Sequence, residues 1–111
     1  MAKYLSSLDD VFGALADPTR RAVVGELGRG PASVGELAQS ASMTLPSFMK
    51  HVQTLERCGL IRTAKSGRVR TCTLDRTRLR VVDRWLAEQR AIWEGRTDRL
   101  EQFVTRPEEP S

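Results

Sequence analysis

The side chains of this sequence that could do chemistry are mostly basic, and they gather in one stretch. Residues 57–80 hold eight Arg and Lys side chains against Asp75 alone, a net charge of +7, whereas residues 1–56 and 81–111 carry −1 and −2. Such a basic block is typical of a surface that contacts phosphate. A solvated surface is the alternative, because fifteen of the eighteen basic residues are Arg and the composition itself is Arg-rich. We favour phosphate contact, since the block overlaps a predicted β-hairpin.

Just before this block, residues 44–58 are predicted to form a helix with a small, polar and basic outer face. Lys50 has Pro46 and Thr54 as its i−4 and i+4 neighbours, so no acidic side chain on the helix pairs with it. Small side chains let a helix sit close to base edges in a DNA major groove. Thr44 could instead be only a helix cap, and His51 only a half-buried packing residue. The side chains expected to reach DNA from this helix are Thr44, Leu45, Pro46, Ser47, Lys50 and His51.

Other kinds of chemistry have few candidates. His51 is the only histidine, and Cys58 and Cys72 are the only cysteines, with no CxxC or CxxH spacing. The sequence has no Ser-His-Asp set, no Gly-rich phosphate loop and no metal cluster. We therefore expect no enzyme activity, no cofactor, no metal site and two free thiols. A redox switch at the two cysteines is a minority hypothesis, because neither spacing nor an obvious base indicates a reactive thiolate.

The helices that must position these side chains have local start signals. A first amphipathic helix is predicted to end before Asp17, which caps a second helix with Pro18 in its first turn. Ser33 and Glu36 have the spacing of a capping box, which predicts a short third helix to about residue 41. The fourth helix follows Thr44, and its buried stripe is predicted from the i, i+4, i+7 spacing of Phe48, Val52 and Leu55.

After Gly59, a predicted helix cap, the pattern changes to the period of β-strands. Residues 60–64 and 69–74 are predicted strands, and residues 65–68 form a tight turn between them. Two short helices followed by a hairpin with a basic tip indicate a winged helix-turn-helix, a mainly α fold with a small β-hairpin. The side chains expected to contact DNA from this wing are Lys65, Arg68 and Arg70, with a solvated hairpin tip as the alternative.

From residue 76 onward the sequence predicts a long C-terminal dimerisation helix. Apolar residues recur every seven positions, a spacing that favours a seam between two chains, although an internal core helix would also need an apolar stripe. We expect one domain over residues 1–105 and a flexible tail at 106–111. The predicted dimer contacts are Leu79, Val82, Leu86, Trp93 and Leu100 of this helix, helped by Leu8, Val11 and Phe12 of the first.

Three segments together resemble the ArsR/SmtB family of winged-helix repressors. They are residues 15–20, Leu-Ala-Asp-Pro-Thr-Arg, residues 33–38, Ser-Val-Gly-Glu-Leu-Ala, and residues 45–61, which run from Leu-Pro-Ser-Phe to Cys-Gly-Leu-Ile. The resemblance covers about residues 5 to 104. It implies a cytoplasmic homodimer that binds operator DNA near its own promoter and is released by a signal.

The sequence departs from the metal-sensing members of that family. One branch carries Cys-Val-Cys-Asp-Leu in the third helix, where this chain has Ser33-Val34-Gly35-Glu36-Leu37. Another branch uses His and carboxylates on the C-terminal helix, which has no His here. We therefore expect a homodimeric repressor of an inverted-repeat operator, without membrane contact and with an unknown effector. The alternatives are a sensor repressor that responds to thiol oxidants or a small ligand, and a winged-helix module that binds protein instead of DNA.

Overall fold

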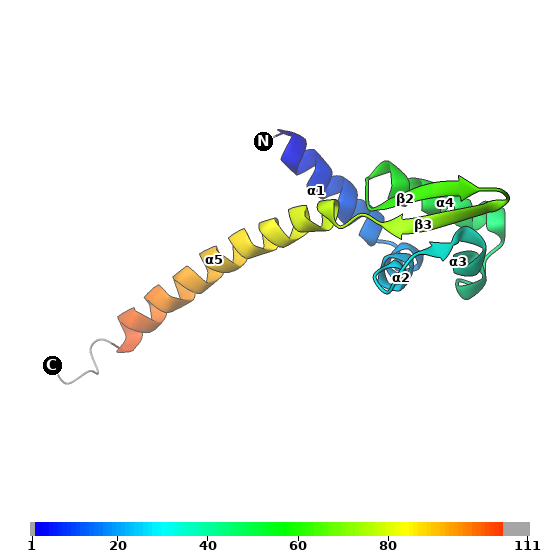
Figure 1. The fold of residues 1–111 in the computed structure, drawn as a ribbon. Helices are drawn as coiled ribbons and strands as arrows, with labels where there is room; N and C mark the ends of the chain where they lie inside the picture. Colours follow the sequence, from blue (N-terminus) through cyan, green and yellow to red (C-terminus); the bar gives the residue numbers. More distant parts are fainter. Residues whose placement is uncertain (1, 106–111) are drawn as a thin grey trace. The chain divides into compact units, whose positions relative to one another are not determined.

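The elements follow the predicted order, with one additional short strand. The computed structural model describes residues 2–105, and the chain divides between Val81 and Val82 into two units. The element order is shown in Figure 1: α1 (Ala2–Leu15), α2 (Pro18–Leu27), β1 (Ala32–Ser33), α3 (Val34–Ser40), α4 (Leu45–Arg57), β2 (Ile61–Ser66), β3 (Val69–Leu74) and α5 (Thr77–Thr105). Only α5 runs across the division between the two units.

The predicted caps of α2 and α3 are confirmed. The carboxylate of Asp17 accepts a hydrogen bond from the Arg20 backbone amide at 3.0 Å, and Pro18 lies in the first turn of α2. The Ser33 hydroxyl accepts from the Glu36 amide at 3.1 Å, while the Glu36 carboxylate accepts from the Ser33 amide at 3.3 Å. These side chains satisfy backbone N–H groups that have no partner inside their helices.

Helix α4 begins after Thr44, as predicted, but the Thr44 side chain makes no capping hydrogen bond. The predicted stripe of Phe48, Val52 and Leu55 is buried. The helix ends in a Schellman turn, because the Leu60 amide donates to the Leu55 carbonyl at 3.0 Å and Gly59 adopts a φ of 82°. Gly59 therefore acts as the predicted C-terminal cap residue of this helix.

The hairpin of β2 and β3 is longer than predicted. Ser66 pairs with Val69, so the turn contains only Gly67 and Arg68, and Lys65 lies in strand β2. Gly67 has a φ of 62°, which permits this tight two-residue turn. The predicted turn at residues 65–68 was therefore too wide. From here on, the wing means the hairpin of residues 61–74.

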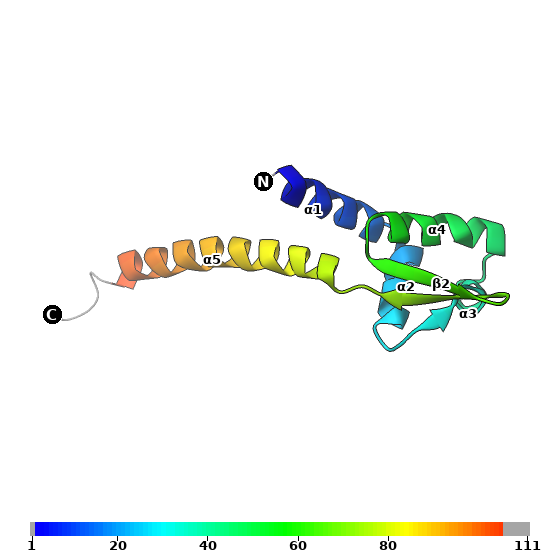
Figure 2. The ribbon, with the colours of Figure 1, turned by 45° about the horizontal axis from the view of Figure 1, so that its top comes forward.

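Strand β1 was not predicted from the sequence. Its two residues, Ala32 and Ser33, pair with Cys72 and Thr71 of β3, which makes a sheet of order β1-β3-β2. A two-residue strand is too short to show a period, so only its pairing with β3 reveals it. Figures 1 and 2 both show α4 alongside the hairpin, with the hairpin turn and the start of α4 at the same end.

The core of the first unit forms where α1, α2, α3, α4 and the sheet meet. Leu8 is 4% exposed and Val11 is 0% exposed, so both side chains already pack inside the chain. The prediction that they help to form a seam with a partner is therefore corrected, and of the three residues predicted in α1 only Phe12, 40% exposed, presents appreciable surface. The largest fully buried side chains are Phe48, Leu37, Leu55, Leu60, Ile61, Val11, Val52 and Cys72.

The second unit consists of α5 from Val82 onward. Its exposed large apolar side chains are Leu86 at 37%, Ile92 at 54% and Trp93 at 54%. Leu79 and Val82 are partly exposed. The Leu100 side chain and the predicted tail at 106–111 lie outside the described residues. Within the described part of the chain, no helix has both the length and the apolar character needed to cross a membrane.

Candidate nucleic-acid interface

The outer face of α4 is exposed from its first residue onward. Thr44, Leu45, Pro46, Ser47 and Lys50 are all exposed, as the sequence predicted for a surface that contacts DNA. Leu45 is 51% exposed, so this surface includes a large apolar side chain. The charged end of Lys50 has no hydrogen bond or ion pair among the described residues, so it is available to an external acceptor.

Gln53 belongs to this face, although the sequence analysis did not select it. It is exposed and lies three residues after Lys50, which places the two side chains on the same side of the helix. A Gln amide can bond bidentately to the N6 and N7 atoms of adenine in a major groove. The signal was present in the sequence, because the positions opposite the buried stripe of α4 are 46, 50, 53 and 57.

The wing presents cations that face each other across its two strands. Lys65 pairs directly with Arg70 in the β2–β3 ladder, and both side chains are exposed. Like charges in this arrangement repel, so an anion bound between them would stabilise the pair. Arg70 also donates to the Thr63 hydroxyl at 3.1 Å, and this hydroxyl donates to the Glu56 carboxylate of α4 at 2.7 Å. The wing is therefore tied to α4 by side-chain hydrogen bonds.

A pocket of about 350 Å³ joins the wing to the start of α4. It contains three basic side chains and no carboxylate, and its apolar part includes Leu45 and Val69, both more than half exposed. The lining residues are Ser33, Val34, Gly35, Leu45, Met49, Lys65, Arg68, Val69 and Arg70. The fold thus brings together two groups of predicted DNA contacts that are some twenty residues apart in sequence.

The rest of the basic block is used in part within the chain. Arg62 lies 3.7 Å from the carboxylate of Asp75, whose pKa is lowered by a hydrogen bond from the Thr77 backbone amide. Arg78 donates to the Ser7 hydroxyl at 2.6 Å and covers Gly59, where a Cβ atom would lie 2.9 Å from its Nε. The net charge of the block therefore overstates the number of cations that face a common partner.

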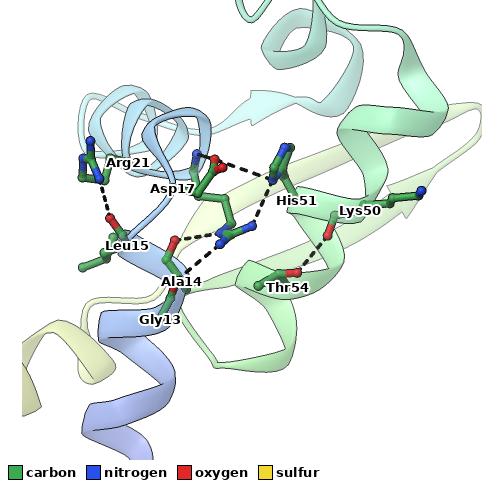
Figure 3. A network of polar contacts seen from close by, with 9 residues as sticks. Gly13, Ala14, Leu15, Asp17, Arg21, Lys50, His51 and Thr54 are labelled. Atoms are coloured by element: carbon green, nitrogen blue, oxygen red, sulfur yellow. Dashed lines mark hydrogen bonds and ion pairs between the residues drawn. The ribbon is translucent and has the colours of Figure 1, made fainter.

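His51 does not lie on the exposed face of α4. Its side chain is only 19% exposed, and its Nδ1 lies 3.1 Å from the guanidinium of Arg20 and 3.7 Å from the carboxylate of Asp17. Figure 3 shows His51 turned toward Asp17, whereas Lys50 points away from this group. The structure thus favours the packing alternative for His51, because α2 supplies polar partners that the sequence pattern of α4 cannot reveal.

The two cysteines lie in different environments. Cys72 is fully buried on strand β3, and this burial raises the pKa of its thiol. Cys58 is half-buried at the end of α4, where its thiol donates to the Leu55 carbonyl at 3.3 Å. A thiol held in its protonated form is a poor nucleophile, so the environment of Cys72 disfavours a redox role.

No metal centre is evident in the part of the chain that the structure describes, because His, Cys, Asp and Glu side chains do not gather there in groups of three or more. Ser33 and Gly35 lie where the resemblance drawn from the sequence would place the third-helix cysteines of metal-sensing members. The Ser33 hydroxyl is engaged in the capping box of α3. This position therefore contributes to the local stability of the helix.

Comparisons with known proteins agree with this architecture. Residues 15–64 match the model of a helix-turn-helix domain family. Over 79 residues the chain is 39% identical to the HTH-type transcriptional regulator Rv2034 of Mycobacterium tuberculosis. The aligned segment covers 71% of this chain and 73% of that protein. It is 28% identical over 79 residues to the transcriptional repressor SdpR of Bacillus subtilis, covering 71% and 88% of the two chains.

Solved structures of similar fold include the crystal structure of an ArsR family transcriptional regulator, RHA00566. The TM-score is 0.79 and the identity 57%, over 85% of this chain and 97% of that one. The fold is also similar to that of a homodimeric winged helix-turn-helix DNA-binding domain, Mb0332 of Mycobacterium bovis. That match has a TM-score of 0.65 and 24% identity, over 81% of this chain and 86% of the other.

A helix-turn-helix joined to a basic hairpin wing defines a class of DNA-binding transcriptional regulators. Within that class, the identities to known members and their coverage show that this chain belongs to the ArsR family. The resemblance inferred from the three sequence segments is thereby confirmed.

Proposed function

We propose that this chain acts in the cytoplasm as a homodimeric repressor, with α4 as the recognition helix in a major groove and the wing on the adjoining DNA backbone. One observation carries the proposal: the pocket between α4 and the wing, which combines exposed Leu45 with the cations of Lys65, Arg68 and Arg70. An acid-free, partly apolar concavity of this kind is suited to a sugar–phosphate backbone.

The side chains of this surface divide into two roles. Lys50 and Gln53 read base edges, because both are exposed on the outer face of α4, and Leu45 supplies an apolar contact for a thymine methyl group. The backbone contacts come from Thr44, Pro46, Ser47, Lys65, Arg68 and Arg70, which lie at the start of α4 and on the wing. His51 is left out of both groups because its Nδ1 is occupied within the chain.

The dimer is proposed from the apolar residues of α5. An amphipathic helix is marginal in water unless its apolar face is packed, and Leu86 and Ile92 are exposed in the single chain. A second copy would cover them through a two-fold axis, with Leu79, Val82 and Phe12 as further contacts. Two similar proteins are named as a repressor and as a homodimeric DNA-binding domain, in agreement with this assembly.

The decisive experiment is footprinting on the DNA upstream of the gene that encodes this chain. We expect protection of an inverted repeat whose half-site centres are about 34–36 Å apart, the separation of successive major grooves on one face of the duplex. Equal affinity for this DNA and for a scrambled duplex would contradict the proposal and would favour a winged-helix module that binds protein.

Gln53→Ala tests the assignment of base reading directly. The variant should lose discrimination between the protected sequence and the scrambled duplex by about 1–3 kcal/mol, whereas its non-specific binding should stay unchanged. Lys50→Ala should also lose discrimination between the two duplexes, because Lys50 is the second proposed base-reading residue. Gln39→Ala is the control, because Gln39 is an exposed glutamine of α3 outside the proposed surface. Equal losses on both duplexes for Gln53→Ala would reduce Gln53 to a backbone contact.

A further inference from the structure

The side chain of Arg20 connects three helices of the first unit. Its Nε donates to the Ala14 carbonyl at 2.7 Å and its Nη2 to the Gly13 carbonyl at 3.3 Å, both at the end of α1. Its Nη1 lies 3.1 Å from Nδ1 of His51 on α4. Arg20 itself stands in the first turn of α2, so one guanidinium spans α1, α2 and α4.

The chemistry of this contact sets the role of each partner in a hydrogen bond. A guanidinium has donors and no acceptor, so in a hydrogen bond with Arg20 it is Nδ1 of His51 that accepts. The Asp17 carboxylate lies 3.7 Å from the same Nδ1 and accepts from the Arg20 amide at 3.0 Å. This amide bond lowers the pKa of Asp17, whose negative charge faces the guanidinium.

The contact adds a directional restraint to the apolar packing of α4. Helix α4 rests on the core through Phe48, Val52 and Leu55, and hydrophobic contact is non-directional. A hydrogen bond depends strongly on distance and angle. His51 directly follows Lys50, so holding the histidine ring limits rotation of α4 about its axis and fixes the direction in which Lys50 projects (Figure 3).

We propose that Arg20 is the positioning residue of the recognition helix, acting through His51 to hold the outer face of α4 in the orientation that reads bases. The effect of Arg20 on DNA reading rests on the function proposed above. The effect of Arg20 on the orientation of α4 is present in the free protein as well. Arg20 acts at a distance from the DNA, and its charge makes no phosphate contact.

Arg21 provides a matched control. It is the neighbouring residue, carries the same charge and also donates to a carbonyl at the end of α1, that of Leu15 at 2.8 Å. Its guanidinium makes no hydrogen bond or ion pair with α4 among the described residues. Comparison of Arg20→Ala with Arg21→Ala therefore separates the link to α4 from the loss of a charge and of a bond to α1.

The DNA-free arm of the test measures the orientation of α4 relative to α2 by residual dipolar couplings. We expect Arg20→Ala and His51→Ala to reorient α4 and Arg21→Ala to leave it as in the wild type. His51→Asn should restore the wild-type couplings, because its side-chain oxygen can accept in place of Nδ1. If Arg20→Ala fails to fold, the comparison of His51→Ala with His51→Asn still tests the proposal. An α4 orientation that is unchanged in His51→Ala would overturn the proposal.

The DNA arm uses the protected upstream duplex and its scrambled counterpart. Arg20→Ala should reduce discrimination about tenfold, as expected for loss of a hydrogen bond to a charged group, with the slope of log affinity against log salt unchanged. A slope that falls by about one would identify Arg20 as a phosphate contact and overturn the proposal. If the wild type shows no discrimination, the proposed function fails, and the dipolar couplings still decide the role of Arg20.

Discussion

Asp17 has two roles at the start of α2, because its carboxylate caps the helix and also faces His51. Replacement by Ala should lower the free energy of unfolding by about 1 kcal/mol at pH 7, the usual cost of losing an N-cap. Asn can accept the same amide bond, so Asp17→Asn should retain most of the stability. Urea unfolding monitored by circular dichroism measures both variants.

The contribution of Asp17 should also depend on pH. Its pKa is lowered in the folded chain below the ordinary value of an aspartate, first by the Arg20 amide bond. The Asp17 carboxylate therefore stabilises the folded state at any pH above the pKa that Asp17 has in the unfolded chain. This stabilisation is lost as the pH falls through the lower pKa that Asp17 has in the folded chain. The difference in stability between wild type and Asp17→Asn should thus be constant near neutrality and shrink below about pH 4. A difference that instead grows in acid would contradict the assigned charge interaction.

The two thiols should react at different rates. Cys72 is fully buried and the pKa of its thiol is raised, whereas Cys58 is half-buried near the surface. Iodoacetamide should label Cys58 in the native protein and reach Cys72 only when denaturant unfolds the chain. Mass spectrometry of the labelled peptides distinguishes the two, with Cys58→Ser as control. Native labelling of Cys72 at the rate of Cys58 would revive the hypothesis of a thiol switch.

At the scale of elements, the wing and α4 act as one surface because they line the same pocket and are tied by the bonds of Thr63. Arg68 lies in the two-residue turn of the hairpin and makes no hydrogen bond or ion pair with any other described residue. We expect Arg68→Ala to lower the slope of log affinity against log salt by about one, with similar losses on operator and scrambled DNA.

Arg62 offers a matched control for this experiment. It belongs to the same strand pair but faces Asp75 at 3.7 Å, so its charge is already partly balanced within the chain. Arg62→Ala should leave the salt slope unchanged. If fluorescence anisotropy titrations over a series of salt concentrations give Arg68→Ala the wild-type slope, the tip of the wing does not contact phosphate.

At the scale of the whole molecule, the exposed apolar residues Leu86 and Ile92 of α5 are the basis of the proposed dimer. Leu86→Glu would place a charge in the proposed seam, where burial without a counter-charge is unfavourable. The variant should sediment as a monomer while the first unit stays folded, because the buried core of that unit lies in other residues. Its affinity for the full operator should fall by about a hundredfold, towards that of one half-site.

Ala91→Glu is the control for this substitution. Ala91 is exposed and lies on the opposite side of α5 from Leu86 and Trp93 by helical spacing. The variant should remain dimeric in sedimentation velocity experiments and bind the operator as the wild type does. A Leu86→Glu protein that also remains dimeric would show that the residues of α5 have another role.

The sequence by itself determined the parts of this protein that depend on neighbouring residues. The caps at Asp17 and Ser33, the buried stripe of α4 and the Gly59 cap are all readable within a few positions, because helix ends and amphipathic faces arise from local backbone bonding and periodicity. The family resemblance followed from the same local segments.

Only the tertiary structure decided the features that depend on residues distant in sequence. Pairing with β3 defines strand β1, packing inside the first unit removes Leu8 and Val11 from the surface, and Arg20 turns His51 inward from a position 31 residues away. The pocket likewise exists only because the wing folds back on α4. Periodicity shows which side of a helix is polar, but the partner that a polar side chain meets is set by the packing of separate elements.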